Sequence, residues 1–116
     1  MTAERFEVRD VPGESRYVLL DHGDDGTSSK EIGEESYVDV GEERVLFHTG
    51  VSDEYAGQGL ASKLVRAVVD DVIAAGRRIV PVCPYVVAWL PKHPEYQAHV
   101  VERRSEHVAA IKAQTR

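Results

Sequence analysis

The hydrophobic period of the sequence changes sharply at Gly59, and this change constrains the fold more than any other feature. Before Gly59, apolar and polar residues alternate in short runs separated by turn residues, which predicts β-strands. After Gly59, apolar residues recur at steps of three and four, which predicts an amphipathic helix that ends near Gly76. The apolar face of this helix consists of Leu60, Leu64, Val65, Val68, Val69, Val72 and Ile73.

Short turns separate most of the predicted strands in the first half of the chain, and a hairpin loop around Asp24–Ser28 separates the second from the third. Such a succession is typical of an antiparallel meander. The strands are expected at residues 6–11, 15–21, 35–40 and 44–51.

The second half adds a strand and two further helices. Residues 78–82 predict a buried strand, in which Pro81 indicates a sheet edge or a bulge. Pro84 can open a short helix that carries Trp89 on its apolar side, and residues 95–114 predict one last amphipathic helix. We therefore expect an α+β fold, with helices on the faces of the sheet.

Length and composition exclude several classes of protein. A chain of 116 residues fits one domain, and no apolar run approaches the roughly 20 residues that a membrane span needs. The net charge of −6 makes nucleic acid an unlikely main partner, because binding it needs concentrated positive charge. One cysteine and an N-terminus without an apolar signal region lead us to expect a cytoplasmic protein.

Two glycines, Gly57 and Gly59, stand at the start of the long helix. The first turn of a helix has unpaired N–H groups, and glycines beside it let an anion approach the main chain. The Gly-Lys-Ser/Thr ending of a Walker loop is missing, and Ser62 occupies the third glycine position of a dinucleotide fingerprint. The local sequence leaves two readings open, a phosphate cradle or a tight strand-to-helix turn.

The stretch AGQGLA, residues 56–61, resembles the acetyl-CoA pyrophosphate loop of the GNAT superfamily of N-acetyltransferases. That loop has the form Arg/Gln-x-x-Gly-x-Gly/Ala, and Gly59 and Ala61 match its fourth and sixth positions. The longer string from HTGVSDEYAGQGLASKLV through VPVCPYVVAWLPKHPEY is similar to the small single-domain GNAT-like proteins. The chain departs from the pattern at Ala56, where Arg or Gln is common, at Gly50, where small relatives carry Glu, and at Ser52, where they often carry Pro.

The resemblance implies a mixed, mostly antiparallel sheet that splays between its fourth and fifth strands and holds the pantetheine arm of acetyl-CoA in the gap. It further implies a GNAT-like acyl-CoA-binding domain over residues 1–100, followed by a C-terminal helical extension over residues 101–116. The residues that would bind acetyl-CoA by this analogy are Val51, Ala56, Gly57, Gln58, Gly59, Leu60 and Ala61.

Three residues are candidates for the chemistry. Cys83 lies between the fifth strand and the next helix, where small GNAT-like proteins carry a cysteine suspected of accepting the acetyl group, although a lone cysteine is more often a buried apolar residue. Tyr85 is near the position from which a GNAT tyrosine protonates the CoA sulfur, but it can equally pack in the core. His48 is a possible base if it points into the cleft, and an exposed strand residue if it does not.

The leading functional prediction is an acetyl-CoA-dependent N-acyltransferase acting on an unidentified amine, either a small molecule or an exposed amine of a protein. The alternatives are a non-catalytic CoA- or acyl-CoA-binding module, a protein-interaction domain, and a fold that binds no nucleotide. We expect no metal, because His93, His99 and His107 lack the spacing of a metal site. We also expect no membrane partner, and a monomer or weak homodimer.

Overall fold

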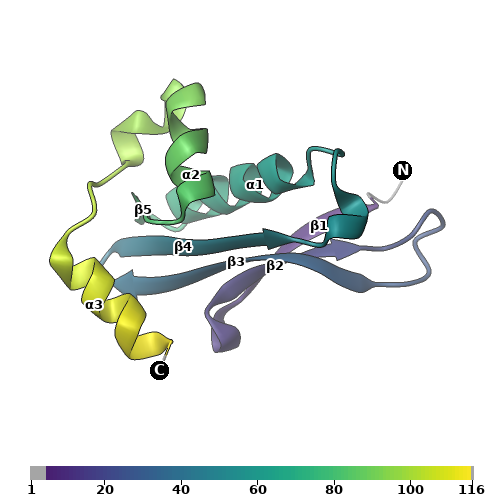
Figure 1. The fold of residues 1–116 in the computed structure, drawn as a ribbon, viewed down its shortest axis with the longest axis horizontal. Helices are drawn as coiled ribbons and strands as arrows, with labels where there is room; N and C mark the ends of the chain where they lie inside the picture. The colour runs from purple at the N-terminus through teal and green to yellow at the C-terminus, as the bar shows by residue number, and fades with distance from the viewer. Residues whose placement is uncertain (1–4, 116) are drawn as a thin grey trace.

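The computed structural model describes residues 5–115 (Figure 1). Residues 1–4, which belong to the N-terminal stretch where we expect no export signal, and residue 116, the last residue of the predicted C-terminal extension, lie outside it. No helix within the described range is long and apolar enough to cross a bilayer.

Five strands form one sheet in the order in which they occur along the chain. They are β1 (Phe6–Val11), β2 (Arg16–Asp21), β3 (Lys30–Val40), β4 (Glu43–Val51) and β5 (Arg78–Pro81). Each adjacent pair among β1 to β4 is antiparallel, and β5 joins the edge of β4 in parallel. The structure thus confirms the mixed, mostly antiparallel sheet. β3 begins earlier than predicted, at Lys30, because its first residues pair with the end of β2.

The helix α1 (Leu60–Ala74) covers one face of the sheet, and α2 (Pro84–Trp89) lies on the same side beside the end of β5 (Figure 1). The predicted apolar face of α1 is buried except for the half-buried Ile73, and Leu64, Val68 and Val72 have no exposed surface. Gly76 ends α1 with a φ of +74°, and the amides of Gly76 and Arg77 bond back to the last helical turn. The helix and sheet therefore share one core, which fixes where α1 begins relative to β4.

The sheet splays between β4 and β5, as predicted. Their pairing runs from Glu43 to Leu46 on β4 and stops there. The amides of Val82 and Cys83 both donate to the carbonyl of Leu46, at 3.0 Å each, and the chain then turns away into α2. The rest of β4, residues 47–51, has no partner strand on that side, so its main chain borders the gap.

A β-bulge at Phe47 decides which side chains of β4 face the helices. Strict alternation along a strand would put His48 on the same face as Leu46. The structure pairs Tyr37 with Leu46 but Ser36 with His48, so that Phe47 is an extra residue and the phase shifts by one. Leu46 and Thr49 consequently share the face beneath the helices, and His48 lies on the other.

The predicted continuous helix over residues 95–114 is wrong. A 3₁₀ segment (Pro94–His99) and an extended stretch precede the helix α3, which spans only Ser105–Gln114. The extended stretch forms because Val100 bridges to Ile79 of β5, and the Val101 amide donates to the Ile79 carbonyl at 2.8 Å. Figure 1 shows α3 at the end of the sheet where β3 finishes, away from α1 and α2.

Candidate functional site

The loop between β4 and α1 is held against the sheet at its start. A short 3₁₀ turn (Asp53–Tyr55) follows β4, and the Tyr55 hydroxyl donates to Asp21 of β2 at 2.5 Å. The chain then passes through Gly57 with a φ of +83° and Gly59 with a φ of +71°. Residues with a Cβ are strained at such φ values, so the backbone conformation of this loop favours glycine at both positions. A Cβ at either glycine would meet no atom within 4 Å, which means that both border open space.

Main-chain donors are available beside this space. Within the described part of the chain, the amides of Gly59, Leu60, Ala61 and Ser62 donate to no protein acceptor; the first bond across this turn is that of Lys63 to the Gly59 carbonyl. These amides form the positive end of the α1 dipole. Free amides beside glycines can donate to a phosphate or pyrophosphate, because no side chain blocks its approach. This is the group that the predicted cradle would hold.

A cavity of about 150 Å³ opens at this loop. It brings together most of the predicted cofactor-binding residues and Tyr85 of α2, whereas Gln58 is exposed and not part of its wall. Ser62 helps to hold α2 beside the cavity, because the Trp89 indole of α2 donates a hydrogen bond to the Ser62 hydroxyl at 2.8 Å. The lining residues are Val51, Ser52, Asp53, Tyr55, Ala56, Gly57, Gly59, Leu60, Ala61, Ser62 and Tyr85.

The wall of this cavity carries no Lys or Arg among the described residues, and Asp53 is its one charged residue. Ala56 stands where the resemblance expects Arg or Gln, so no side chain clamps the anion from that position. Binding of a diphosphate here would rest on main-chain amides and the helix dipole alone.

Cys83 immediately precedes α2 and is 5% exposed. Its Sγ lies 3.1 Å from Oγ1 of Thr49 on β4, at the point where β4 and β5 have separated. The thiol therefore sits in the splay of the sheet, where the resemblance places the thioester of acetyl-CoA.

Glu35 of β3 adds a titratable group that the sequence reasoning missed. It is fully buried and pairs across the strands with Thr49, whose hydroxyl donates to Glu35 Oε1. Burial raises the pKa of this carboxyl to about 8, against the lowering effect of hydrogen bonds from the Thr49 hydroxyl and the His48 main chain. The sequence did contain a signal for its burial. Glu35 stands two residues before Tyr37, so alternation along β3 puts both side chains on the same, inward face.

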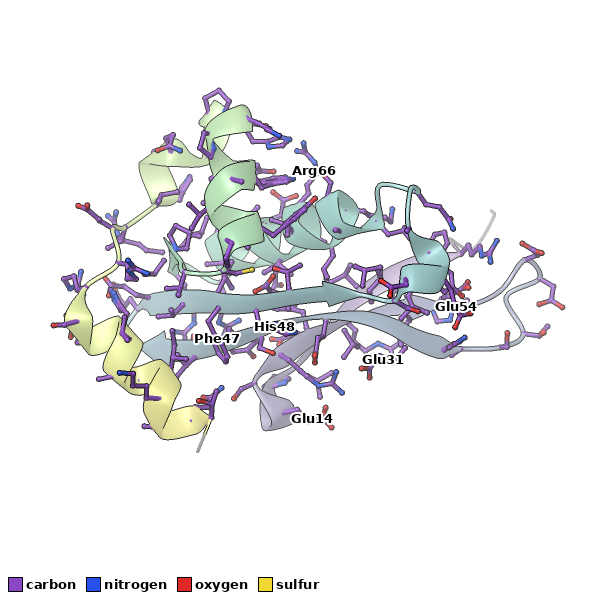
Figure 2. The ribbon with its side chains drawn as sticks, viewed as in Figure 1. Glu14, Glu31, Phe47, His48, Glu54 and Arg66 are labelled. Carbon is purple, nitrogen blue, oxygen red and sulfur yellow. The ribbon has the colours of Figure 1, made fainter. Side chains whose placement is uncertain are left out.

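His48 lies apart from these groups. Its side chain, labelled in Figure 2, is 56% exposed, and its Nε2 is 3.6 Å from Glu34 Oε2. The bulge at Phe47 puts it on the face of β4 opposite Thr49 and Cys83. Of the three candidates for the chemistry, the structure places Cys83 at the splay and Tyr85 in the cavity wall, and it does not bring His48 to either.

No group of His, Cys, Asp and Glu side chains in residues 5–115 could hold a metal ion. His93 stacks on Trp89 instead, and the buried His107 bonds to Glu43 through Nε2 at 2.7 Å. The Arg104 amide donates to the other ring nitrogen of His107, so this histidine fastens α3 to the start of β4.

Comparison with known proteins adds two solved structures. A GCN5-like putative N-acetyltransferase from Staphylococcus aureus is 27% identical, with a TM-score of 0.61; the match covers 90% of this chain and 97% of that one. The ribosomal-protein-S18-alanine N-acetyltransferase from Escherichia coli is 22% identical, with a TM-score of 0.47, over 67% of this chain and 42% of that one. No curated protein sequence is significantly similar to this chain.

A match to a family model assigns the chain to a family. The model described as GCN5-related N-acetyl-transferase matches residues 16–100, which include β2 to β5, α1, α2 and the glycine loop. The match covers most of the chain and contains both the splayed sheet and the free amides. This chain belongs to the GCN5-related N-acetyltransferase family.

Proposed function

We propose that this protein is an acetyl-CoA-dependent N-acyltransferase that acts on an unidentified amine. The observation that carries the proposal is the row of free amides from Gly59 to Ser62, which faces open space beside two glycines. This arrangement can hold the pyrophosphate of acetyl-CoA without cationic side chains. Membership of the family supports the reaction class.

The unpaired edge of β4 gives the pantetheine arm a place to lie. An extended chain with amide groups can add to a sheet edge as a strand does, and residues 47–51 offer such an edge. Val51 lines the cavity at one end of this edge, and Thr49 touches Cys83 near its middle. The path therefore leads from the glycine loop toward the thiol.

The bound acetyl-CoA would supply an activated acetyl thioester, and the chain's own groups would manage the protons. We assign to Tyr85, which lines the cavity and is 38% exposed, the protonation of the departing sulfur. His48 has no part in this proposal, because it faces away from the splay. The net charge of −6, to which Asp53 and Glu54 contribute, favours a cationic acceptor.

Assembly and location are part of the same proposal. Residues 1–100 would form the acyl-CoA-binding domain and residues 101–116 a C-terminal extension, which His107 fastens to Glu43. We propose a cytoplasmic monomer or weak homodimer, in which residues of one chain line the cavity.

A second candidate function is a CoA- or acyl-CoA-binding module without turnover. The specific observation in its favour is the cavity wall without a cation, together with Ala56 and Gly50 in place of the Arg/Gln and Glu of relatives. Both features weaken binding or proton transfer and leave the main-chain cradle intact.

Calorimetry and a thiol-release assay separate these candidates. Calorimetry with CoA should give a Kd in the micromolar range or weaker, or about −8 kcal/mol or less favourable. Release of free CoA thiol from acetyl-CoA should then depend on an added mixture of amines. Binding without amine-dependent release would favour the module, and no binding at millimolar CoA would contradict both candidates.

A further inference from the structure

We propose that Glu35, Thr49 and Cys83 form a proton relay, in which the buried carboxyl group of Glu35 takes the proton of the Cys83 thiol through the Thr49 hydroxyl. The relay would make Cys83 the nucleophile that accepts the acyl group. This inference rests on the proposed acyl transfer and gives it a covalent route. It names two residues, on neighbouring strands, that neither the family match nor the sequence pattern marks as functional.

Thr49 stands between the other two groups. Its Oγ1 hydrogen-bonds to Glu35 Oε1 on one side and lies 3.1 Å from Cys83 Sγ on the other. A hydroxyl can donate one hydrogen bond and accept others at once, so it can receive a proton from sulfur while it passes its own to the carboxylate. The bulge at Phe47 makes this possible, because it turns Thr49 to the buried face.

Glu35 is unusual for a group with only a structural role. The residue has no exposed surface, and its Oε2 finds no hydrogen-bond partner in the described part of the chain. Buried polar atoms are generally paired, because leaving one unpaired costs about 1–3 kcal/mol. No Lys or Arg within residues 5–115 bonds to this carboxyl group either. A buried carboxyl kept at such a cost beside a thiol indicates a role in chemistry.

The proton affinity of Glu35 fits a relay. Burial raises the pKa of Glu35 to about 8, so its carboxylate is a stronger base than an ordinary exposed carboxylate. The other titratable groups nearby are Glu34, which raises the pKa of Glu35, and His48, which pairs with Glu34 on the far face of the sheet.

In the first step, the S–H bond of Cys83 breaks, Thr49 takes that proton, and Thr49 gives its own proton to Glu35. Cys83 sulfur forms a bond to the acetyl carbon, the thioester C–S bond breaks, and Tyr85 donates its proton to the departing sulfur. In the second step, the amine displaces Cys83, which regains its proton from Glu35 through Thr49. The surplus proton of the amine restores Tyr85 through water, so the sum is one acetyl group moved from sulfur to nitrogen.

Alkylation by iodoacetamide tests the relay without any acyl donor. Cys83 is the one cysteine of the sequence, so each modification is assigned by mass alone. The rate would be measured from pH 6.5 to 9 for wild type, Glu35→Gln, Thr49→Val and Thr49→Ser. Rates in denaturant, where the thiol is exposed in every variant, provide the reference, and circular dichroism checks each fold.

The relay predicts that the wild-type rate rises with a midpoint near pH 8. At pH 8, Glu35→Gln and Thr49→Val should each be slower by at least about tenfold, since a positioned base typically contributes 10²–10⁴-fold. Thr49→Ser keeps the hydroxyl and should stay within about twofold of wild type. Wild-type rates in folded Glu35→Gln would overturn the relay, and so would a wild-type thiol that iodoacetamide never reaches.

A matched experiment with acetyl-CoA distinguishes a failure of the relay from a failure of the proposed function. Mass spectrometry should find an acetyl group on wild-type Cys83 and on Thr49→Ser, with formation slowed in Thr49→Val. Amine acetylation that continues in Cys83→Ala would overturn the covalent route while leaving the proposed function intact. The loss of CoA binding in wild type would remove the proposed function, and the alkylation rates would still decide whether Glu35 takes the thiol proton.

Discussion

Substitution of Gly59 by valine separates the two roles that a glycine can have at a helix start. At Gly59, φ is +71°, and Gly76 at the other end of α1 has a φ of +74°. A Cβ would meet nothing within 4 Å at either position. Gly76→Val is therefore a matched control, which imposes a similar backbone strain at the far end of the same helix.

The expected magnitudes follow from this match. A left-handed conformation costs an L-residue roughly 1–2 kcal/mol, and somewhat more when the side chain is β-branched. Both variants should lose a similar amount of stability in urea titrations, and both should remain folded if the domain has the usual 5–15 kcal/mol. Only Gly59→Val puts methyl groups into the space beside the free amides, so only this variant should lose CoA affinity, by at least about 1.4 kcal/mol or tenfold.

Calorimetry with CoA on the two variants and on wild type gives the comparison. Gly76→Val should bind as wild type does, and Gly59→Val should bind at least about tenfold more weakly. Normal binding by Gly59→Val would refute the loop assignment. Equal loss of binding in both variants would show that strain in α1, and not a blocked cradle, accounts for the effect.

Three further predictions concern other parts of the structure. Tyr85→Phe should leave CoA binding unchanged and slow acetyl transfer by roughly 10²-fold or more, because it removes the donor for the departing sulfur; an unchanged rate would assign Tyr85 to packing alone. In the wild type, stability should fall by about 1.4 kcal/mol per unit between about pH 5 and 8, because folded Glu35 with its raised pKa keeps a proton that the unfolded chain loses. Urea titrations should show that Glu35→Gln removes this slope, and equal slopes would contradict the raised pKa. His107→Ala should lower amide-exchange protection in α3 more than in α1, because it removes the buried bond to Glu43; equal loss in both helices would contradict a local role.

The sequence predicted the elements whose local pattern and packing agree. The apolar face of α1 was readable because it is buried at every expected position from Leu64 to Val72. The edge position of β5 was readable from Pro81. This proline lies on the last strand of the sheet and pairs with Leu46 of β4. The glycine loop was readable because a turn with positive φ admits few other residues.

The relay was not readable because it depends on pairing between strands. A bulge has no reliable local signature, and the one at Phe47 decides which side of β4 faces the core. Strict alternation would put His48 on the face of Leu46, and it does not reveal the contacts of Thr49. Glu35 finds Thr49 only through the register of β3 against β4, which the pattern of either strand alone does not specify.

The prediction for the C-terminal segment was wrong for a similar reason. Residues 95–114 have helix-compatible spacing, yet Val100 and Val101 attach to Ile79 and remain extended. A tertiary contact thus overrides a weak local preference, as is common where the helix signal is poor. The helix resumes at Ser105, after the capping interaction between Arg104 and His107.

The most direct test is an amide NMR titration of ¹⁵N-labelled protein with CoA, with pantetheine as the matched ligand that lacks the pyrophosphate. CoA should shift the amide signals of Gly59, Leu60, Ala61 and Ser62 most, whereas pantetheine should move only those along the free edge of β4. Saturation with CoA that leaves these four amides unmoved would contradict the claim that the main chain holds the pyrophosphate.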